Sequence, residues 1–378
     1  MKIIFTGGGT GGHFYPIISI AQAIGRISKE KKLIKPSMYY FSSTSYNPGL
    51  LYDNNIEYKK TSAGKMRRYF SILNLTDLFK TTWGIINALI DVFDIYPDVV
   101  FGKGGFGSFP TLIAARILRI PIIIHESDTV PGRVNKWAGK FAYRVALSYP
   151  QATEYFKKEK TAVTGQPLQR ELLEPAGSEG HRYWNLEENL PTILVLGGSS
   201  GAEKINNAIM DALPDLLKNY QVIHQTGERN IKVIEETSNS ILLNNPLLKQ
   251  RYKSKGYLTL LDERMAAGAA DLIISRAGST IFEIASWGKP SIIIPLTDSN
   301  GDHQVKNAFA YAASGAAEVI KESNLTPHVL ISEIKRIIDS PEIKTRMQNS
   351  AKAFFKPGAD EIIAKEILGI ALSHEELE

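Results

Sequence analysis

Short apolar runs rich in β-branched residues recur along the chain between stretches of helical periodicity. They lack the polar and apolar alternation of a half-exposed sheet, so they predict buried parallel strands. The first series comprises Ile3–Phe5, Met38–Phe41, Asp98–Phe101, Ile120–Ile124 and Val145–Leu147. The second comprises Thr192–Leu196, Gln221–His224, Leu258–Leu261, Leu272–Ile274, Ser291–Ile294 and Ala317–Ile320. The predicted fold class is α/β, with two Rossmann-like, doubly wound parallel-sheet domains.

A segment that breaks regular structure separates the two series. It contains Gly165-Gln166-Pro167 and the polar stretch Glu174–Pro191, a composition typical of linkers. At 378 residues the chain is also too long for one ordinary core. We expect a first domain over residues 1–163, a second over 164–355, and a C-terminal helix at about 356–378 that packs back on the first domain.

Composition narrows the class of protein. A hydrophobic fraction of 43% and a charged fraction of 22% are those of a soluble globular enzyme. No apolar run reaches the roughly eighteen residues of a membrane span, and the apolar start is too short for a signal peptide, so we expect a cytoplasmic protein. The absence of cysteine excludes disulfides, thiolate metal sites and cysteine nucleophiles. A net charge of +5 favours an anionic partner, and nucleic acid, an anionic membrane or a phosphorylated substrate would fit.

The run Gly7–Gly12, in which five of six residues are glycine, lies between a predicted strand and a predicted helix. Such a turn brings backbone N–H groups and a positive helix end to one place, which suits a phosphate. The acidic ribose ligand of a dinucleotide site is missing downstream, so NAD is disfavoured. The alternative is a glycine turn that serves only tight packing of strand and helix.

The second series opens in the same way, with the strand and glycines of Ile193–Ala202. In open parallel sheets ligands bind beyond the carboxyl ends of the strands, so we expect both glycine loops to face a cleft between the domains. Another strand leads into Ser275–Glu283, whose small residues start a helix that can bind a second phosphate, with Glu283 placed for a ribose diol. The alternative here is an ordinary Ser/Thr helix cap.

Two further loops carry candidate polar residues. Asp302 is expected to cap a helix, from whose first turn His303 and Gln304 project. In the first series, the glycine-dense turn Phe101–Pro110 lies beside His125-Glu126-Ser127-Asp128. The latter residues lack the spacing of metal ligands, and a hydrogen-bonded loop is the alternative to a functional one.

The segment Lys65–Phe70 precedes an apolar stripe at helical spacing. The simplest interpretation of the stripe is a core-facing helix. The basic and aromatic residues that lead into it, with Leu73 and Trp83 nearby, would also suit an anionic membrane surface. The sequence leaves these two interpretations open. The stripe consists of Leu75, Leu78, Phe79, Ile86, Leu89 and Phe93.

In this order the motifs resemble those of the MurG family of bacterial peptidoglycan glycosyltransferases, over nearly the whole chain. The resemblance rests on Gly8–His13 with Pro16, Gly104–Phe106, His125-Glu126, Pro131-Gly132, Thr164-Gly165, Gly197–Ser199, Arg276–Gly278, Glu283 and Asp302–Gln304 with Asn307. It implies a GT-B fold and inverting transfer of N-acetylglucosamine from UDP-N-acetylglucosamine to the muramyl 4-hydroxyl of lipid I, which gives lipid II. It also implies no cofactor, no obligate metal, no nucleic acid, and a peripheral place on the cytoplasmic face of the cell membrane.

The resemblance carries roles onto individual residues. His13 is implied as the general base, with Glu126 as a second catalytic residue. Donor or acceptor diphosphate contacts fall on Thr10, Gly11 and Gly12, and pyrophosphate contacts on Ser199, Arg276 and Gly278. Glu283 is assigned to the ribose, Gln304 to the sugar and Leu261 to the uracil. Further substrate contacts are implied at Asp128, Gln169, Arg170, Ser279 and Thr280.

Three positions depart from the family pattern. Asp128 stands where the family has Asn, and so adds a negative charge. Gln169 stands where the family has Arg, which moves the arginine to Arg170 or loses it. The loop between Arg276 and Glu283 is one residue shorter. Alternative functions are another GT-B lipid glycosyltransferase, a UDP-sugar epimerase on the same plan, or a non-catalytic protein that binds nucleotide sugars.

Overall fold

The computed structural model describes residues 1–64, 73–177, 179–198, 202–297 and 302–373, with the side chains of residues 73–79 left out. The chain forms two compact units. Unit 1 contains Met1–Gln169 together with the C-terminal segment from Lys356, and unit 2 contains Arg170–Phe355. The first unit thus continues past residue 163, where the composition shift suggested a boundary.

Unit 1 is built on a seven-stranded sheet whose pairings are all parallel, in the order β3-β2-β1-β4-β5-β6-β7. This order reverses direction at β1 and β4, as in doubly wound folds. The strands are β1 (Lys2–Thr6), β2 (Ser37–Ser42), β3 (Ile56–Lys60), β4 (Val99–Gly102), β5 (Ile122–Glu126), β6 (Arg144–Leu147) and β7 (Thr161–Val163).

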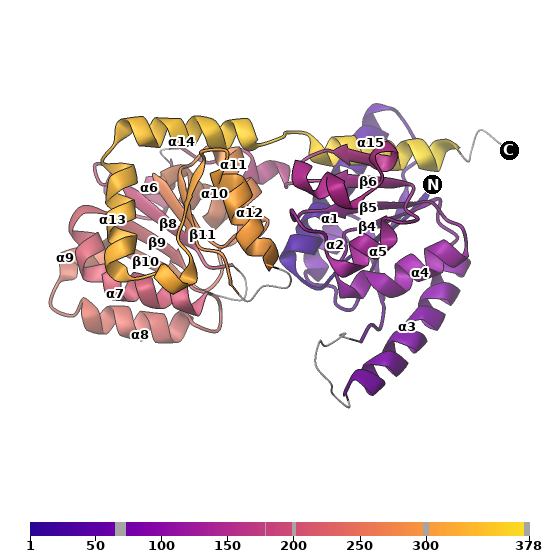
Figure 1. Cartoon of the computed structure of the whole chain (residues 1–378), viewed down its shortest axis with the longest axis horizontal. Helices are drawn as coiled ribbons and strands as arrows, with labels where there is room; N and C mark the ends of the chain where they lie inside the picture. The colour runs from indigo at the N-terminus through magenta and orange to yellow at the C-terminus, as the bar shows by residue number, and fades with distance from the viewer. Residues whose placement is uncertain (65–72, 178, 199–201, 298–301, 374–378) are drawn as a thin grey trace. The chain divides into compact units, whose positions relative to one another are not determined.

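Helices cover both faces of this sheet (Figure 1). Neighbouring residues on a strand point to opposite faces, so Ile3 packs with α1 and α15, and Ile4 packs on the other face with α3 and α4. Helix α15 contacts α1 directly, so the C-terminal segment completes the first core. The helices are α1 (Gly11–Glu30), α2 (Pro48–Asp53), α3 (Leu73–Ile95), α4 (Phe109–Ile117), α5 (Arg133–Ala138) and α15 (Ala359–Ser373).

Unit 2 has a six-stranded parallel sheet in the order β10-β9-β8-β11-β12-β13. One face packs on α7 and α13, and the other on α10, α11 and α14. The strands are β8 (Thr192–Leu196), β9 (Gln221–Gln225), β10 (Tyr252–Lys255), β11 (Leu272–Ser275), β12 (Ser291–Ile293) and β13 (Ala317–Val319). The helices are α6 (Glu179–Tyr183), α7 (Glu203–Asn219), α8 (Ile231–Ile241), α9 (Pro246–Gln250), α10 (Leu260–Ala269), α11 (Thr280–Trp287), α12 (His303–Ala312), α13 (Pro327–Ile338) and α14 (Pro341–Phe354).

The predicted α/β class with two parallel sheets is confirmed, and the strands that the sequence pattern missed lie at sheet edges. Strands β3, β7 and β10 each end a sheet. An edge strand is covered less completely than a central one, so its sequence need not be a continuous apolar run. The polar sequence Tyr-Lys-Ser-Lys of β10 is an example.

The strand predicted at Leu258–Leu261 is wrong. Thr259 begins helix α10 there with a capping box: its hydroxyl accepts from the Asp262 N–H, and the Asp262 carboxylate accepts from the Thr259 N–H. This reciprocal pair satisfies two backbone donors that a strand would have to pair with a neighbour. Leu261 therefore lies in the first turn of a helix, and the residue is 46% exposed.

The apolar stripe on α3, for which the sequence left two interpretations open, is divided between them. Leu89 packs against the core beside Ala88 and Val92, whereas Ile86 and Phe93 are exposed. A repeat at helical spacing shows that a helix has an apolar face but not whether protein covers that face. Residues 65–70 and the side chains of Leu75, Leu78 and Phe79 lie outside the described residues. None of the described helices combines the length and hydropathy needed to cross a membrane.

Candidate functional site

The glycine run of unit 1 joins the carboxyl end of β1 to the start of α1. Thr10 stands at the N-cap position with extended backbone, but its hydroxyl is 2.8 Å from His13 Nδ1 and caps no backbone N–H. Within the described residues, no protein acceptor takes the N–H groups of Gly11 and Gly12. The helix start therefore presents donors to any anion that binds there.

Close packing also accounts for several of these glycines. A Cβ atom at Gly8 would lie 2.9 Å from His13 Nδ1, and one at Gly9 would lie 2.7 Å from Thr44 Cγ2. At Gly11 a Cβ would lie 2.8 Å from Tyr46 Oη. The packing interpretation and the anion-binding interpretation are thus compatible, because the same turn is both crowded on its inner side and open at its N–H groups.

A second glycine turn packs against the first. Gly105 has a φ of +76°, and a Cβ atom there would lie 2.9 Å from Gly8 Cα and 3.1 Å from His13 Cε1. The imidazole of His13 is therefore held between the two loops. Burial, and then the nearby Lys103 ammonium, lower the pKa of His13 to about 3, so the ring is neutral near pH 7.

Glu126 holds the loop that follows β5. Its carboxylate accepts hydrogen bonds of 2.9 to 3.0 Å from the N–H groups of Ser127, Asp128 and Gly132 and from Asn135 Nδ2. Burial raises the pKa of Glu126, and Asp128 raises it further. This is the hydrogen-bonded loop that the sequence offered as the alternative, and the catalytic role of Glu126 remains a prediction.

The other candidates at this end of unit 1 are placed as follows. His125 is fully buried, with Nε2 3.0 Å from the Gly165 carbonyl oxygen, and burial holds its pKa well below the usual value. Gln169 is buried and is the last residue of the first segment of unit 1, and Arg170 is exposed at the start of unit 2.

In unit 2 the first glycine turn follows β8. Gly198 has a φ of +78°, which favours glycine, and a Cβ atom at Gly197 would lie 3.1 Å from the Gln225 carbonyl oxygen. Ser199 lies outside the described residues, so its predicted phosphate contact has no structural description.

The segment between β11 and α11 is the second predicted phosphate site. Ser279 is at the N-cap position but its side chain makes no capping bond, and Thr280 begins the helix. A Cβ atom at Gly278 would meet no atom within 4 Å, so the backbone is open there. Asn307 of α12 fixes the loop from behind, because its Nδ2 donates to the Ala277 carbonyl oxygen at 3.1 Å.

Arg276 is partnered in this structure. Its guanidinium forms a 2.6 Å ion pair with Glu322 and donates to the Ile294 carbonyl oxygen at 3.1 Å. Glu322 also accepts from Lys204 Nζ at 3.2 Å and from the Thr297 hydroxyl at 3.3 Å. Its side chain is 3% exposed, and the pairing cations lower its pKa against the effect of burial. No sequence motif pointed to Glu322, which lies in a short polar segment after β13.

Glu283 is paired with a second carboxyl group that the sequence reading missed. Its side chain hydrogen-bonds that of Glu263 on α10, and burial, which is the largest cause, raises the pKa of Glu283 to about 7. Burial and Glu283 together hold the pKa of Glu263 well above its usual value. Two carboxyl groups this close share one proton at neutral pH. The mistaken strand at Leu258–Leu261 concealed that Glu263 is on a helix.

The remaining candidates described in unit 2 are Gln304 and Asp302, at the start of α12. The Gln304 side-chain oxygen accepts from the Leu296 N–H at 3.1 Å, so this amide is fixed against the loop after β12. Asp302 has the N-cap position of α12 but a φ of +55° and no side-chain cap, which corrects the expected cap.

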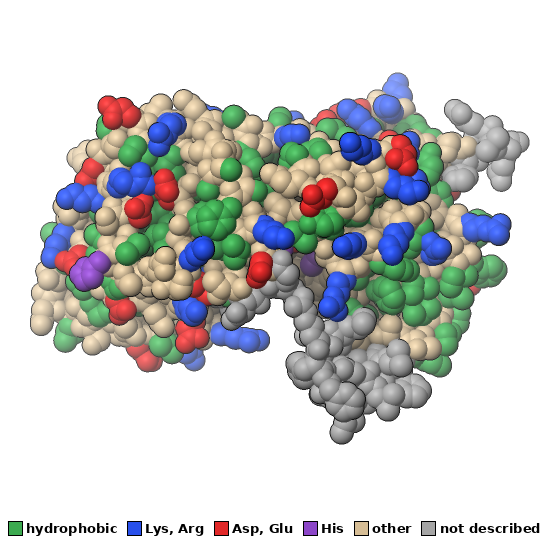
Figure 2. Space-filling model, in the orientation of Figure 1, with side chains coloured by type: hydrophobic (Ala, Val, Ile, Leu, Met, Phe, Trp, Pro, Cys, Tyr) green, Lys and Arg blue, Asp and Glu red, His purple; other side chains and the backbone are tan. Residues whose placement is uncertain are grey.

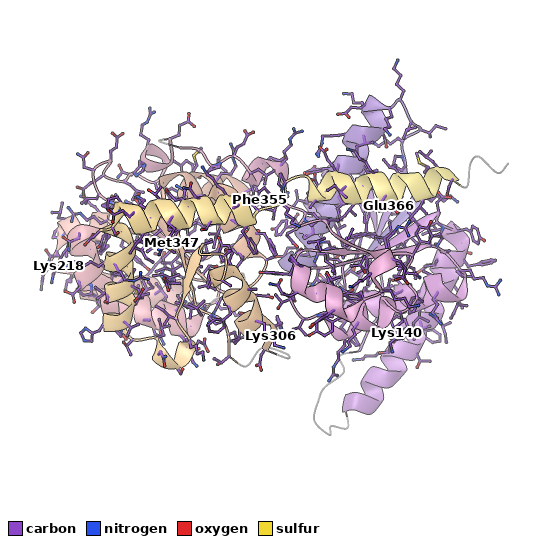
Figure 3. All side chains as sticks on the ribbon, turned by 45° about the horizontal axis from the view of Figure 1, so that its top comes forward. Lys140, Lys218, Lys306, Met347, Phe355 and Glu366 are labelled. Carbon is purple, nitrogen blue, oxygen red and sulfur yellow. The ribbon has the colours of Figure 1, made fainter. Side chains whose placement is uncertain are left out.

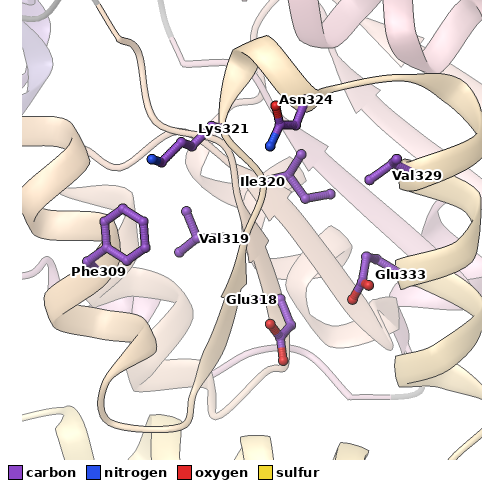
Figure 4. Close-up of a pocket in the computed structure, with 8 residues that line it drawn as sticks. All are labelled: Phe309, Glu318, Val319, Ile320, Lys321, Asn324, Val329 and Glu333. Atoms are coloured by element: carbon purple, nitrogen blue, oxygen red, sulfur yellow. The ribbon is translucent and has the colours of Figure 1, made fainter.

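A cavity of about 300 Å³ lies beside strand β13 (Figure 4). The Lys321 ammonium there lies 5.8 Å from the Phe309 ring centre. None of the predicted site residues lines this cavity, so it does not extend the candidate site. Its lining residues are Phe309, Glu318, Val319, Ile320, Lys321, Asn324, Val329 and Glu333. The described residues contain no cluster of three His, Asp or Glu side chains that could hold a metal ion.

Comparison with known proteins gives the family. The glycosyltransferase family 28 N-terminal domain matches residues 3–147, and the glycosyltransferase family 28 C-terminal domain matches residues 192–362. The chain is 37% identical to the UDP-N-acetylglucosamine--N-acetylmuramyl-(pentapeptide) pyrophosphoryl-undecaprenol N-acetylglucosamine transferase of Thermodesulfovibrio yellowstonii, over 96% of this chain and 97% of that one.

Solved structures agree on the fold. MurG of Acinetobacter baumannii is 25% identical, with a TM-score of 0.72, over 97% of this chain and 99% of that one. A UDP-GlcNAc 2-epimerase of Neisseria meningitidis bound to UDP-GlcNAc has a TM-score of 0.68 at 17% identity, over 98% and 100%. The epimerase shares the fold alone. With the relative of 37% identity matched almost end to end, the chain belongs to the MurG family of glycosyltransferases and has the GT-B fold.

Proposed function

We propose that this protein transfers N-acetylglucosamine from UDP-N-acetylglucosamine to the 4-hydroxyl of the muramyl sugar of undecaprenyl-diphosphate-linked lipid I, with inversion at the anomeric carbon. The observation that carries the proposal is the end-to-end identity of 37% to a transferase named for this reaction. The same fold also occurs in an epimerase, so the fold by itself does not decide between the two activities.

The donor is assigned to the carboxyl-end loops of unit 2. Glu283, at the first turn of α11, carries a carboxyl group that can accept hydrogen bonds from the ribose hydroxyls. The open backbone at Gly278, together with Ser279 and Thr280, suits the pyrophosphate. Leu261 is assigned to the uracil, Gln304 to the sugar, and Ser199 to the pyrophosphate by family resemblance.

Arg276 is assigned to the charge of the departing UDP. Its ion pair with Glu322 holds the guanidinium in place while leaving 15% of its side chain exposed. A preorganised cation that need not be reoriented stabilises developing negative charge better than a mobile one. Helix starts and this arginine supply that stabilisation through the protein's own groups.

The acceptor is assigned to the glycine loop of unit 1, with its diphosphate on the N–H groups of Gly11 and Gly12. His13 is assigned as the base. When Nδ1–H donates to the Thr10 hydroxyl, Nε2 keeps its lone pair and, among the described residues, has no hydrogen-bond partner. Nε2 takes the proton of the acceptor hydroxyl as its oxygen bonds to the anomeric carbon, and UDP leaves with the electrons of the broken bond.

A membrane surface is assigned to helix α3. Trp83, Ile86, Ile90 and Phe93 recur at helical spacing and are each at least 45% exposed. Figure 2 shows hydrophobic side chains gathered over α3 and α4, with lysine and arginine nearby. An exposed apolar stripe beside cations suits the interface of an anionic bilayer, where a lipid-linked acceptor resides.

One experiment separates the candidate functions. Purified protein is given UDP-N-acetylglucosamine with and without a lipid I analogue, and the products are identified by mass spectrometry. The proposal predicts UDP and a disaccharide lipid only when the acceptor is present. Conversion of the donor without acceptor would indicate an epimerase, and binding without UDP release would indicate a non-catalytic protein.

A further inference from the structure

The Glu322 carboxylate of unit 2 holds two cations, and the proposed function uses only one of them. Arg276 Nη2 lies 2.6 Å from Glu322 Oε1, and Lys204 Nζ lies 3.2 Å from Glu322 Oε2. The two cations are therefore held on the two oxygens of one carboxylate, whose side chain is 3% exposed. One carboxylate balances the charge of one cation, so this group of three side chains keeps an unbalanced positive charge.

The two cations come from neighbouring strand-to-helix turns. Ser275 ends β11 and pairs with Leu196, which ends β8, and the Ser275 hydroxyl donates to the Leu196 carbonyl oxygen at 3.3 Å. Arg276 directly follows the first of these strand ends, and Lys204 is in the first turn of α7, which follows the other. Lys204 therefore reaches the partner of Arg276 from a second turn at the carboxyl end of the same sheet.

Space and hydrogen-bond donors for an anion remain at these turns. A Cβ atom at Gly198 or at Gly278, one in each turn, would meet no atom beyond its chain neighbours within 4 Å, among the described residues. The Lys204 ammonium has three N–H donors, and in the part of the chain that the structure describes only Glu322 accepts from it. Its side chain is 64% exposed, so the remaining donors are accessible to a ligand.

Stability gives little reason for a lysine at this position. Lys204 stands in the first turn of α7, where the positive end of the helix dipole disfavours a cation. An ion pair with an exposed lysine contributes little to the free energy of unfolding, because water already solvates the ammonium. Glu322 also has Arg276 as its counter-ion. A bound anion would compensate both the helix start and the unbalanced cation.

We propose that Lys204 is a further donor-binding residue: together with Arg276 it binds the diphosphate of the nucleotide sugar, and Glu322 holds both cations in place. This inference rests on the proposed function, which assigns the donor to the carboxyl-end loops of unit 2. That function gives the diphosphate charge to Arg276 and to helix starts, and Lys204 adds a cation from the turn after β8. Hydrogen bonds between an ammonium and phosphate oxygens are roughly twice as strong as those between neutral groups.

The test compares UDP with uridine, which lacks the phosphates, as ligands of the full chain. Calorimetry measures the Kd of UDP, and titration followed by nuclear magnetic resonance measures that of uridine. In Lys204→Met, which removes the charge, the Kd of UDP is expected to rise about fivefold or more, while that of uridine stays within about twofold. Lys204→Arg, which keeps the charge, is expected to bind UDP within about threefold of wild type.

Lys218→Met is the matched control. Lys218 lies at the other end of α7 (Figure 3), its side chain is 63% exposed, and its ammonium forms a 2.6 Å ion pair with Asp215. It matches Lys204 in helix, exposure and type of partner, but it lies at the end of α7 that leads into β9. Both Kd values are therefore expected to stay within about twofold of wild type. Lys204→Gln replaces the methionine variant if circular dichroism shows that the latter does not fold.

The outcomes separate this proposal from the one on which it rests. A folded Lys204→Met variant that binds UDP like wild type would overturn the proposal and leave the donor assignment in place. Equal losses of UDP and uridine binding would also overturn it, because a purely structural role affects both ligands alike. A loss of UDP affinity in Lys218→Met as large as in Lys204→Met would do the same. Wild-type protein that does not bind UDP would contradict the donor assignment itself, and this proposal with it.

Discussion

The two strand-to-helix turns, β1 to α1 in unit 1 and β11 to α11 in unit 2, use one backbone arrangement for different chemistry. In both, small residues expose a helix start, and the N-cap side chain makes no capping bond. In unit 1 the neutral His13 lies at the turn, and the ionisable side chains of Lys103 and Glu126 are buried. In unit 2 the ionisable groups Arg276 and Glu283 belong to the turn itself, and each has a partner.

The difference shows how a shared fold supports two tasks. A histidine that acts as a base must be unprotonated before the reaction, whereas a group that binds a ribose or a diphosphate must keep a fixed direction. In unit 1 burial is the largest cause that favours the neutral form of His13, and the Lys103 ammonium adds to it. In unit 2 Glu263 hydrogen-bonds Glu283, and the Glu322 carboxylate forms an ion pair with Arg276. Burial thus sets the charge state of His13 in unit 1, whereas Glu263 and Glu322 are the partners of Glu283 and Arg276 in unit 2.

The largest expected effect is that of His13→Ala. Turnover is expected to fall by about a hundredfold or more, because a positioned general base is typically worth that factor. UDP affinity, measured by calorimetry, is expected to stay within about twofold, since the group accepts a proton and holds no donor charge. Steady-state release of UDP gives the rate. Turnover within about threefold of wild type would contradict the assignment of His13 as the base, and the turn of unit 1 would then have a binding role like that of unit 2.

Glu283→Ala is expected to act on binding instead of turnover. Loss of hydrogen bonds to a charged carboxylate costs about 1.5–3 kcal/mol, so the Kd for UDP is expected to rise about tenfold or more. Glu236→Ala on the exposed side of α8 is the matched control. Calorimetric titration that gives wild-type affinity for the Glu283 variant would contradict the ribose assignment.

Trp83→Glu addresses a second contrast, between the exposed apolar residues of the two units. Binding to vesicles of anionic lipid is expected to weaken about fivefold, because burial of a large apolar side chain is worth about 1.5–3 kcal/mol and part of it is recovered by neighbours. Val233→Glu on α8 is the control, since Val233 is 62% exposed but lies on unit 2. Equal loss in both variants, measured by sedimentation with vesicles, would refute a specific membrane face on α3.

Two threonines at helix starts give a smaller and more exact comparison. Thr259 caps α10 through its hydroxyl, so Thr259→Ala is expected to lower the free energy of unfolding by about 1 kcal/mol. Thr10 makes no cap and bonds His13, so Thr10→Ala is expected to affect turnover more than stability. Urea unfolding of both variants measures this. A loss of about 1 kcal/mol in Thr10→Ala as well would show that Thr10 supports α1.

A further prediction concerns the pH dependence of stability that the Glu263 and Glu283 pair contributes. The pKa of Glu283 is raised from 4.5 to about 7, so the folded state binds more protons than the unfolded state between these values. The free energy of unfolding contributed by the pair is therefore expected to fall as pH rises from 4.5 to 7. Glu263→Gln is expected to flatten this slope, because the raised pKa of Glu263 contributes to it and a glutamine does not titrate. Urea unfolding at several pH values measures how the free energy of unfolding depends on pH. The same dependence in wild type and Glu263→Gln would contradict the coupling of the pair.

Motifs marked both candidate turns but not the partners of their side chains. A glycine run marked the turn after β1 and a run of small residues marked the turn after β11, because local composition is enough to recognise them. Glu263 was hidden by a misassigned strand, and Glu322 gave no signal at all. Each acts through a residue about 20 or more positions away in the chain, and such pairings depend on how helices pack across a sheet.

The sequence by itself determined the α/β class, two parallel sheets, the central strands and the family, since these follow from buried apolar runs and ordered motifs that local interactions preserve. Tertiary structure decided the edge strands β3, β7 and β10, the exposed face of α3 and the charge state of His13. Those depend on what covers each surface and on which ionisable groups burial brings together, and neither quantity is a property of neighbouring residues in the chain.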